Sequence, residues 1–353
     1  MRELAGDLAR LGAERTPYAL ARVVETWSSA PRLPGAAMIV TATGEVIASV
    51  SGGCVEGAVV ELAAQVLADG VPRLETYGVS DSDAFAVGLT CGGVISVLVE
   101  PVTAGHPLAD PALLADLAGD RPVVLRTTLA DGAVATTAST GPAALAAGPT
   151  RTGRSPHSAE GRPHSAEGRP QSAGVFVHAM PGRPLMILAG ANDFVRTLAA
   201  QGRLLGYRVE VVDARAAFAT PERFPDADSV VVDWPHRHLA RARAEGRIDG
   251  RTAICVLSHD PKFDIPAIAE ALGSPAGYVG AMGSRRTDAE RRERLREAGV
   301  TDDRLDRLSS PIGLDLAAAS PAETAVAIAA EIVMLARGGT PHRLVDTTEA
   351  IHR

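Results

Sequence analysis

Short apolar runs alternate with amphipathic stretches through the second half of the chain. Leu185–Gly190 is a continuous apolar run, Asp193–Leu205 has apolar residues at helical spacing, and Arg208–Asp213 is a second apolar run. Three further runs of the same kind follow at residues 229–233, 252–257 and 277–280. Strands without polar alternation, separated by helices, indicate a parallel sheet that is covered on both faces. The pattern therefore predicts an α/β, doubly wound parallel-sheet domain here.

The first two of these strands end in residues that bear on nucleotide binding. Asp213 follows Gly190 at the spacing where a Rossmann-like fold places its ribose-binding carboxylate. The glycine turn, however, reads Gly190-Ala191-Asn192-Asp193-Phe194-Val195, without the two further glycines of the nucleotide fingerprint. Asn192 places a side chain where a pyrophosphate must approach the backbone, and Asp193 places a negative charge at the helix N-terminus. We expect a Rossmann-like domain in which ordinary NAD(P) binding is disfavoured.

Strands and helices follow a different order in the first half. Residues 36–41 and 46–50 flank the turn Ala42-Thr43-Gly44-Glu45, which is typical of a β-hairpin. Further strands are predicted at residues 18–26, 73–79, 94–99, 121–129 and 133–137, and helices at 3–13 and 55–67. We expect a mixed α/β domain over residues 1–147, whose strand order the pattern leaves open.

A repeated segment separates the two halves. The heptad Pro156-His157-Ser158-Ala159-Glu160-Gly161-Arg162 recurs at once and then begins a third time. It contains no large apolar residue, so it can form neither a coiled-coil seam nor a core. We predict a flexible linker over residues 148–174, followed by the second domain over residues 175–353.

Two cysteines flanked by glycine pairs give the strongest chemical signal. Cys54 lies in Ser51-Gly52-Gly53-Cys54-Val55-Glu56-Gly57, between a strand and a helix, and Cys91 precedes Gly92-Gly93. A position near a helix N-terminus favours a thiolate, and glycine amides can approach a ligand closely. Two packed core thiols are the alternative, because cysteine is often a small core residue. Cys255 lies inside an apolar run, where packing is expected.

Two turns of the second half carry polar residues directly after strands. Ser258-His259-Asp260 lies at a carboxyl strand end, where open α/β sheets bind ligands, although a turn with satisfied hydrogen bonds is the alternative. Tyr278–Thr287 reads as a strand, a glycine-rich turn and a helix start, whose amides, Ser284 and arginines suit a phosphate. Arginines alternate with glutamates from Arg291 to Arg296, which predicts a solvated helix face.

Composition narrows the class of protein. At 353 residues the chain is long enough for two domains, and 46% hydrophobic with 22% charged residues is typical of globular proteins. The formal charge of −7 gives no support for nucleic-acid binding. No apolar run is long enough to span a bilayer, the N-terminus lacks a signal pattern, and there are only three cysteines. We therefore expect a cytoplasmic protein without a membrane partner.

Five ordered motifs together resemble a known family. They are Ser51–Gly57, Leu89–Gly93, Ser258-His259-Asp260, Tyr278–Arg286 and Pro311-Ile312-Gly313-Leu314-Asp315. With them the chain is similar to the XdhC/CoxI family, the accessory factors of xanthine dehydrogenase and related molybdenum hydroxylases. The resemblance implies that the protein binds the molybdenum cofactor (molybdopterin), protects it, supports its sulfuration and delivers it to an apo molybdenum hydroxylase. A cysteine desulfurase-type sulfur donor and a homodimer are further expected partners. The family's Rossmann turn usually continues Gly-Ala-Gly-His, and Asn192 and Asp193 replace the last two residues here.

The resemblance also suggests roles for single residues. Cys54 and Cys91 would contact the cofactor, relay its sulfur or hold a metal. The candidate cofactor-binding residues are Gly52, Gly53, Cys54, Glu56, Cys91, Gly92, Gly190, Asp213, Gly280, Gly283, Ser284, Arg285 and Arg286. A cofactor chaperone is the leading interpretation. The alternatives are an NAD(P)-dependent oxidoreductase, with His259 and Asp260 as catalytic residues, and a metal-dependent family member recruited to another pathway.

Overall fold

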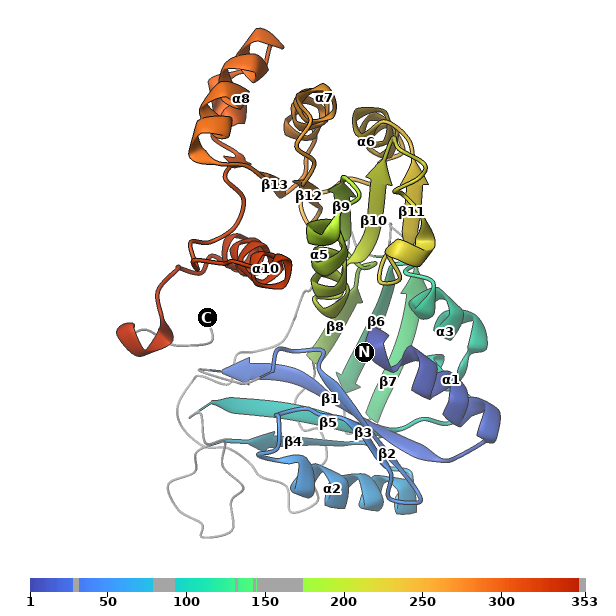
Figure 1. Ribbon diagram of the computed structural model, residues 1–353. Coiled ribbons are helices and arrows are strands. Elements are labelled where there is room, and N and C mark those ends of the chain that lie inside the picture. The colour runs from blue at the N-terminus through green and yellow to red at the C-terminus, as the bar shows by residue number, and fades with distance from the viewer. Residues whose placement is uncertain (28–31, 79–92, 131–132, 142–143, 145–173, 349–353) are drawn as a thin grey trace. The chain divides into compact units, whose positions relative to one another are not determined.

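The computed structural model of the chain describes residues 1–353 except 28–31, 79–92, 131–132, 142–143, 145–173 and 349–353 (Figure 1). The chain divides into two compact units, one formed by residues 1–182 with 347–353 and the other by residues 183–346. Cys91, Gly92 and nearly all of the expected linker lie outside the described residues.

The main sheet of the first unit is antiparallel. Its described strands follow the order β3-β2-β1-β5-β4. Their bounds are β1 (Tyr18–Trp27), β2 (Ala37–Thr41), β3 (Val46–Ala48), β4 (Arg73–Tyr77) and β5 (Val94–Pro101). The predicted hairpin is confirmed, since β2 pairs antiparallel with β3.

Helices cover both faces of this sheet. Helix α2 (Glu56–Asp69) buries Val59, Ala63 and Val66 against one face. Helices α1 (Ala5–Glu14) and α3 (Pro111–Ala118) share a second core with Leu20 and Ile39 on the opposite face. Short 3-10 helices cover Arg2–Leu4 and Pro107–Ala109.

A smaller antiparallel sheet completes the first unit and moves the expected domain boundary. It has the order β7-β6-β8, with β6 (Val123–Ala130), β7 (Ala133–Thr140) and β8 (Gly174–Met180). We expected residues 175–180 in the second domain, but β8 pairs with β6 along its whole length. The second unit therefore begins at Arg183 and not at residue 175.

The second unit contains the predicted Rossmann-type sheet. Its described strands are all parallel and have the order β11-β10-β9-β12-β13-β14. They are β9 (Leu185–Ala189), β10 (Arg208–Asp213), β11 (Ser229–Val232), β12 (Ala253–Val256), β13 (Tyr278–Ala281) and β14 (Leu308–Ser309). The fold class and five of these strands agree with the apolar runs of the sequence, because strands buried on both faces have little room for polar residues.

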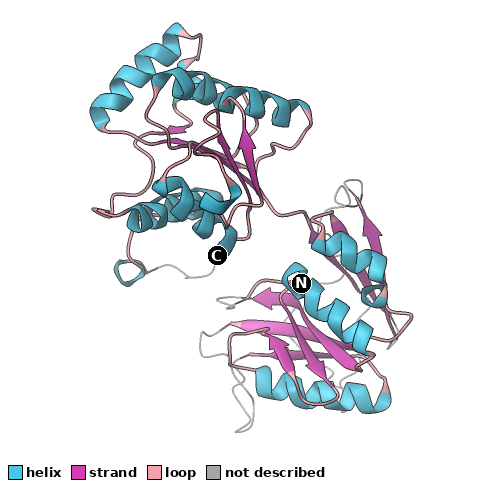
Figure 2. Cartoon of the chain, turned by 45° about the vertical axis from the view of Figure 1, so that its right-hand side comes forward, coloured by secondary structure: helices cyan, strands magenta, loops and turns pink. Residues whose placement is uncertain are grey.

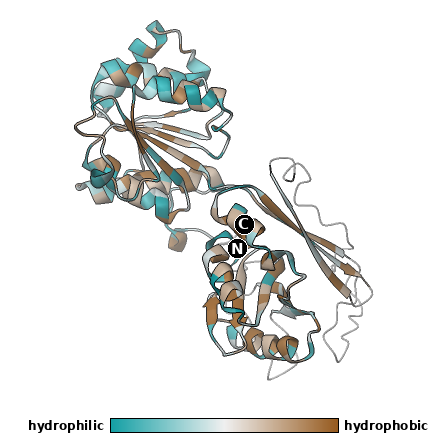
Figure 3. Ribbon diagram, turned by 90° about the vertical axis from the view of Figure 1, so that its right-hand side faces the viewer, coloured by the Kyte–Doolittle hydropathy of each residue, from teal (hydrophilic) through white to brown (hydrophobic). Residues whose placement is uncertain are grey.

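Helices flank the parallel sheet on both faces (Figure 2). Helices α5 (Asp193–Leu204) and α10 (Pro321–Arg337) pack on one face. Helices α6 (Pro235–Ala244), α7 (Pro261–Leu272) and α8 (Arg285–Glu297) pack on the other. Short helical segments cover Pro221–Arg223, Asp302–Leu305 and Leu344–Asp346. Hydrophobic residues concentrate in the strands and hydrophilic residues on the outer helix faces (Figure 3).

Helix α10 begins with a capping box. Ser320 and Glu323 form a reciprocal capping box, in which the Ser320 hydroxyl accepts from the Glu323 amide and the Glu323 carboxylate accepts from the Ser320 amide. A cap of this kind contributes about 1 kcal/mol of stability. None of the helices in the described part of the chain combines the length and the apolar character needed to cross a bilayer.

Candidate functional site

The loop that carries Cys54 depends on its glycines. Gly52 and Gly53 have φ values of 84° and 119°, which side-chain-bearing residues rarely adopt. Both glycines are exposed, and a Cβ atom on either would meet no atom within 4 Å. The glycines are therefore needed to turn the chain into α2, and they leave open space above the loop. Cys54 is half-buried and packs against the core that α2 shares with the main sheet.

The carboxylate of Glu56 fills the centre of the same loop. One oxygen, Oε1, accepts from the amides of Val50, Ser51 and Gly52 at 3.2, 2.9 and 3.1 Å. The other, Oε2, accepts from the amide of Gly53 at 2.8 Å and from the Ser51 hydroxyl at 2.5 Å. We expected these amides to face a ligand, but here they face a side chain of the same loop.

These donors keep Glu56 ionised. Burial alone would raise the pKa of Glu56, but hydrogen bonds from Ser49, Ser51 and the backbone lower it to about 2. The negatively charged carboxylate of Glu56 thus lies at the N-terminus of α2. It compensates the helix dipole that we expected to act on Cys54. The Cys54 amide donates to the Ser51 hydroxyl at 3.0 Å.

The other two cysteines differ in how far they can be described. Cys255 is fully buried in β12 and its burial raises the pKa of its thiol, which confirms the expected packing role. Cys91 and Gly92 lie outside the described residues, so the proximity of Cys54 and Cys91 stays a prediction.

The carboxyl edge of the parallel sheet is where this fold class binds ligands, beside the point at which strand order reverses. That point lies between β9 and β12. Gly190 has a φ of 119°, and a Cβ there would come within 3.1 Å of the Ser258 amide nitrogen. The first glycine of the turn is therefore required by the close approach of the 257–258 segment.

Asn192 occupies the helix start that a pyrophosphate would use. Its Oδ1 accepts from the Val195 amide at 3.1 Å, and its Nδ2 donates to the Leu257 carbonyl at 2.8 Å. The side chain thereby caps α5 and connects it to the end of β12. Asp193 adds an exposed negative charge in the first turn. A dinucleotide phosphate fits poorly here, because the Asn192 side chain lies at the helix start and the Asp193 charge opposes an anion.

Asp213 ends β10 at the expected ribose-binding position. It is buried, and Arg215 binds it through three nitrogens, with the backbone amide and Nε donating to Oδ1 and Nη2 to Oδ2 at 2.8 to 2.9 Å. Arg215 in turn lies over the Phe218 ring, 4.8 Å from its centroid. The carboxylate is thus held by its own loop.

His259 and Asp260 follow β12 on the exposed surface. Asp260 caps α7, since its carboxylate accepts from the Lys262 amide at 3.0 Å. His259 is exposed. The capping bond accounts for the aspartate, while the catalytic role considered for both residues stays a prediction.

Gly280 packs against protein. A Cβ there would lie 2.5 Å from the Ile312 Cδ1 atom and 2.8 Å from the Tyr278 hydroxyl. That hydroxyl donates to Glu331, which also accepts from the Gly313 amide at 2.8 Å. The glycine is needed so that the loop after β14 can cross β13.

The turn after β13 carries exposed polar groups. Ser284 caps α8 by accepting from the Thr287 amide at 3.1 Å. Arg285 and Arg286 form the first turn of this helix and are exposed, and the Arg286 side chain is 90% exposed. Cationic side chains at a helix start suit an anionic group such as a phosphate. Gly283, one residue earlier, lies against Arg291 and Thr287.

Arg291 corrects the expectation of a solvated helix face. It is only 5% exposed, and it donates to the Met282 carbonyl and the Ser310 hydroxyl. Near it lies Asp264, a buried carboxylate that we did not single out from the sequence. Leu295, four residues after Arg291 and fully buried, was the available signal, because residues four apart share a helix face.

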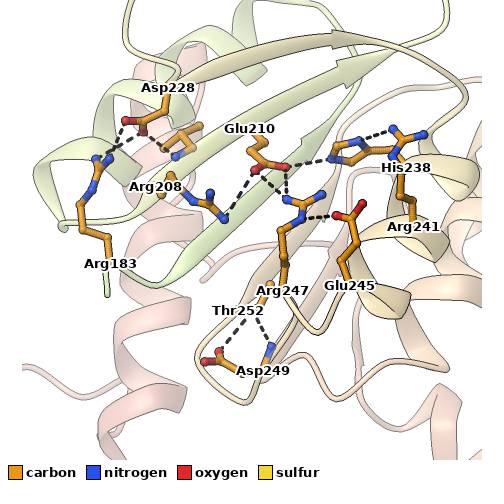
Figure 4. Close-up of polar contacts among 11 residues, drawn as sticks. Arg183, Arg208, Glu210, Asp228, His238, Arg241, Glu245, Arg247, Asp249 and Thr252 are labelled. Atoms are coloured by element: carbon orange, nitrogen blue, oxygen red, sulfur yellow. Dashed lines mark hydrogen bonds and ion pairs between the residues drawn. The ribbon is translucent and has the colours of Figure 1, made fainter. Parts of the chain in front are cut away.

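A second polar network lies toward the amino ends of the same strands (Figure 4). Glu210 of β10 is buried and accepts two hydrogen bonds from Arg247 Nη1, at 2.8 and 3.0 Å. His238 of α6 lies 2.9 Å from Glu210 through Nε2, and its Nδ1 is 3.2 Å from Arg241. Because arginine can only donate, His238 Nδ1 is the acceptor and Nε2–H donates to Glu210. Burial would raise the pKa of Glu210, but these donors lower it to about 2.

Within the part of the chain that the structure describes, no group of three or more metal-ligating His, Cys, Asp or Glu side chains occurs. A thiolate-bound metal would need Cys91, which lies outside that part. Among the candidate residues, those after β13 fit an anionic, phosphate-bearing molecule, because the exposed Arg285 and Arg286 lie in the first turn of α8.

Comparisons with known proteins identify the family. A sequence profile described as the XdhC Rossmann domain matches residues 186–332, and one described as the XdhC and CoxI family matches residues 11–78. The two profiles cover parts of both units. The chain belongs to the XdhC and CoxI family, as its motifs predicted.

Individual relatives are similar across most of the chain. The Escherichia coli molybdenum cofactor insertion chaperone PaoD is 29% identical over 89% of this chain and 81% of its own. A Bacillus subtilis protein named as a probable xanthine dehydrogenase subunit is 27% identical over 89% of this chain and 92% of its own. The uncharacterized E. coli protein YqeB is 25% identical over 93% of this chain, which spans only 45% of YqeB. A crystal structure described as a xanthine dehydrogenase from Bacillus halodurans matches 98% of this chain and 97% of its own, with 25% identity and a TM-score of 0.69.

Proposed function

We propose that the protein carries the molybdenum cofactor as cargo during the maturation of a xanthine dehydrogenase-type molybdenum hydroxylase. The family and the name of the relative PaoD support this role. The structural observation that supports it most directly is the turn after β13, where Ser284, Arg285 and Arg286 form an exposed, basic helix start. Molybdopterin carries a phosphate, and the arginine side chains of this turn supply positive charge and hydrogen-bond donors for it.

We propose that the thiol of Cys54, together with Cys91, supports sulfuration of the cargo. A persulfide on a cysteine desulfurase-type donor would pass its outer sulfur to the attacking Cys54 thiolate. The donor cysteine would leave as a thiolate, so the exchange is balanced without an external oxidant. Partial exposure of Cys54, which directly follows the exposed Gly52 and Gly53, is consistent with attack from outside. We further propose delivery to an apo molybdenum hydroxylase by a cytoplasmic homodimer.

An NAD(P)-dependent oxidoreductase is the second candidate. The Rossmann strand order and the position of Asp213 favour it. Asn192 at the start of α5 and Arg215 on Asp213 weigh against it, because both occupy groups that a dinucleotide would bind. A metal-dependent family member acting through Cys54 and Cys91 is a third candidate.

Ligand analysis of the purified protein tests these candidates. Molybdenum and zinc are measured by elemental analysis, and pterin by fluorescence after oxidation. Pterin should be present in the wild type, lost in Cys54→Ala and Cys91→Ala, and retained in the matched control Cys255→Ala. Failure to take up pterin even after loading with free cofactor, together with retained NAD(H), would instead support the oxidoreductase.

A further inference from the structure

A buried arginine connects two loops at the carboxyl edge of the parallel sheet. Arg291 projects from α8 and donates through Nη1 to the Ser310 hydroxyl at 2.7 Å and through Nη2 to the Met282 carbonyl at 2.6 Å. Met282 is the first residue after β13, and Ser310 is the first after β14. One guanidinium therefore fixes the spacing of two neighbouring loops.

Asp264 extends the connection to a third loop. It lies in the first turn of α7, is 4% exposed, and accepts a hydrogen bond from the Ser258 hydroxyl. Its second oxygen is 4.0 Å from Arg291 Nη2. Ser258 follows β12, so the chain Ser258–Asp264–Arg291 spans the carboxyl ends of β12, β13 and β14, which are neighbours in the sheet.

Arginine is suited to this position in a way that lysine is not. Its planar fork presents two nitrogens in a fixed geometry, whereas lysine has one. The turn after β13 closes directly over the guanidinium, since a Cβ on Gly283 would lie 3.2 Å from Arg291 Nη2. Glycine therefore suits position 283, because a side chain there would crowd the Arg291 guanidinium.

Two of the three connected loops continue into residues of the candidate site. His259 follows Ser258, and Ser284 with Arg285 follows Met282 closely. We infer that Arg291 and Asp264 are positioning residues, which hold these loops in one arrangement for the anionic cargo of the proposed function on which this inference rests. They act through the loops, because both side chains are buried and neither is open to a ligand.

The protonation state of Asp264 should change with pH, whereas a purely packing role for this side chain would not. Burial raises the pKa of Asp264 to about 6, although the Ser258 hydroxyl, Arg291 and His259 favour its charged form. Asp260 is the neighbouring charge that opposes ionisation. Near neutral pH the Asp264–Arg291 pair is charged on both sides, and below pH 6 the carboxyl group is neutral. The order of the three loops should therefore depend on pH around 6.

The test compares the full chain with Arg291→Met, Arg291→Lys and Asp264→Asn, and with Arg294→Met as the matched control. Arg294 lies on the same helix and is exposed. Amide hydrogen exchange is followed in residues 258–260, 282–284 and 310–315. Binding of molybdenum cofactor released anaerobically from a purified molybdenum hydroxylase is measured on both sides of pH 6. Thermal unfolding confirms that each variant is folded.

Arg291→Met should speed exchange in all three loops and weaken cofactor binding about tenfold or more, the usual effect of removing a residue that orients direct contacts. Arg291→Lys should recover part of both, and Arg294→Met should change neither. Asp264→Asn should flatten the pH dependence of binding. Faster exchange in one loop only, or unchanged binding by Arg291→Met, would overturn the inference. A wild type that binds no cofactor, with all three loops loosened in Arg291→Met, would reject the proposed function and leave the positioning role standing.

Discussion

Two buried carboxylates, one at each end of the parallel sheet, differ in how far their charge is compensated. Toward the amino ends, Glu210 is surrounded by Arg247 and His238, and its pKa falls to about 2 (Figure 4). At the carboxyl ends, Asp264 has one hydroxyl donor and an arginine 4.0 Å away, and burial raises its pKa to about 6. The compensated charge of Glu210 stabilises the fold. Asp264, whose charge is incompletely compensated, lies beside exposed polar groups, which is typical of functional sites.

The largest expected effect concerns the amino-side network. Glu210→Gln should lower the free energy of unfolding by about 3 kcal/mol, because it leaves the buried side of Arg247 without its anion. Glu245→Gln is the control, since Glu245 also binds Arg247 but is half exposed, and should cost under about 1 kcal/mol. Urea unfolding is followed through Trp234 in a Trp27→Phe background, because the only other tryptophan lies in the first unit. Equal losses of unfolding free energy in both variants would contradict the special role of the buried Glu210 carboxylate.

At the carboxyl side, Asp264→Asn should reveal a pH dependence of stability whose sign is opposite to that of Glu210. The folded state holds the Asp264 proton more tightly than the unfolded chain, whose pKa is near 3.8. Stability from this group is therefore greatest below pH 4 and falls by about 2 kcal/mol as the pH rises to 6, and the variant should lack this fall. Glu210 should behave in reverse, losing stability as the pH falls from about 4.5 to about 2. The same slope in wild type and Asp264→Asn would contradict this account.

Ser258→Ala should lower the free energy of unfolding by about 1 kcal/mol, because it removes the hydrogen bond to Asp264. The Ser258 hydroxyl lowers the pKa of Asp264, so its removal should move the midpoint of that transition above 6. Ser274 is an equally buried serine whose hydroxyl donates to the Ala271 carbonyl. Ser274→Ala should cost similar stability without moving the midpoint. A shift in both variants would show that the effect is not carried by the Ser258–Asp264 bond.

Arg285→Ala should have the smallest effect on stability, below about 0.5 kcal/mol, because the side chain is exposed. Binding of inorganic pyrophosphate, measured by calorimetry, should nevertheless weaken about tenfold if the turn holds an anion. Arg294→Ala, an exposed arginine on the same helix, should leave binding unchanged. Equal weakening in both variants would indicate only general attraction by positive charge.

The sequence predicted the fold of the second unit well because the parallel strands are buried on both faces. Continuous apolar runs such as Leu185–Ala189 then identify strands directly. The capping box at Ser320 is also encoded locally, because its two residues are three apart in the sequence. The start of the unit was missed, since the strand at 174–180 belongs with β6, and pairing partners distant in sequence leave no local pattern.

The candidate site was predictable only in part. Its glycine turns and the exposed residues Ser284 and Arg285 were found from motifs. The buried pair of Asp264 and Arg291 was not, because Arg291 lies in a strongly charged helix and the contact spans two elements. The role of Glu56 was also missed, since its bonds depend on the backbone conformation of Gly52 and Gly53.

The amides of the Cys54 loop bind an anion that belongs to the chain itself, the carboxylate of Glu56. A tethered group competes at a high effective concentration that a freely diffusing phosphate or sulfate seldom reaches. The loop amides are therefore closed to dissolved anions at neutral pH, and salt should compete poorly for them. Selectivity at this end of the protein would then rest on the thiol of Cys54 and on the shape of the open glycine surface, with little contribution from the charge of the incoming molecule.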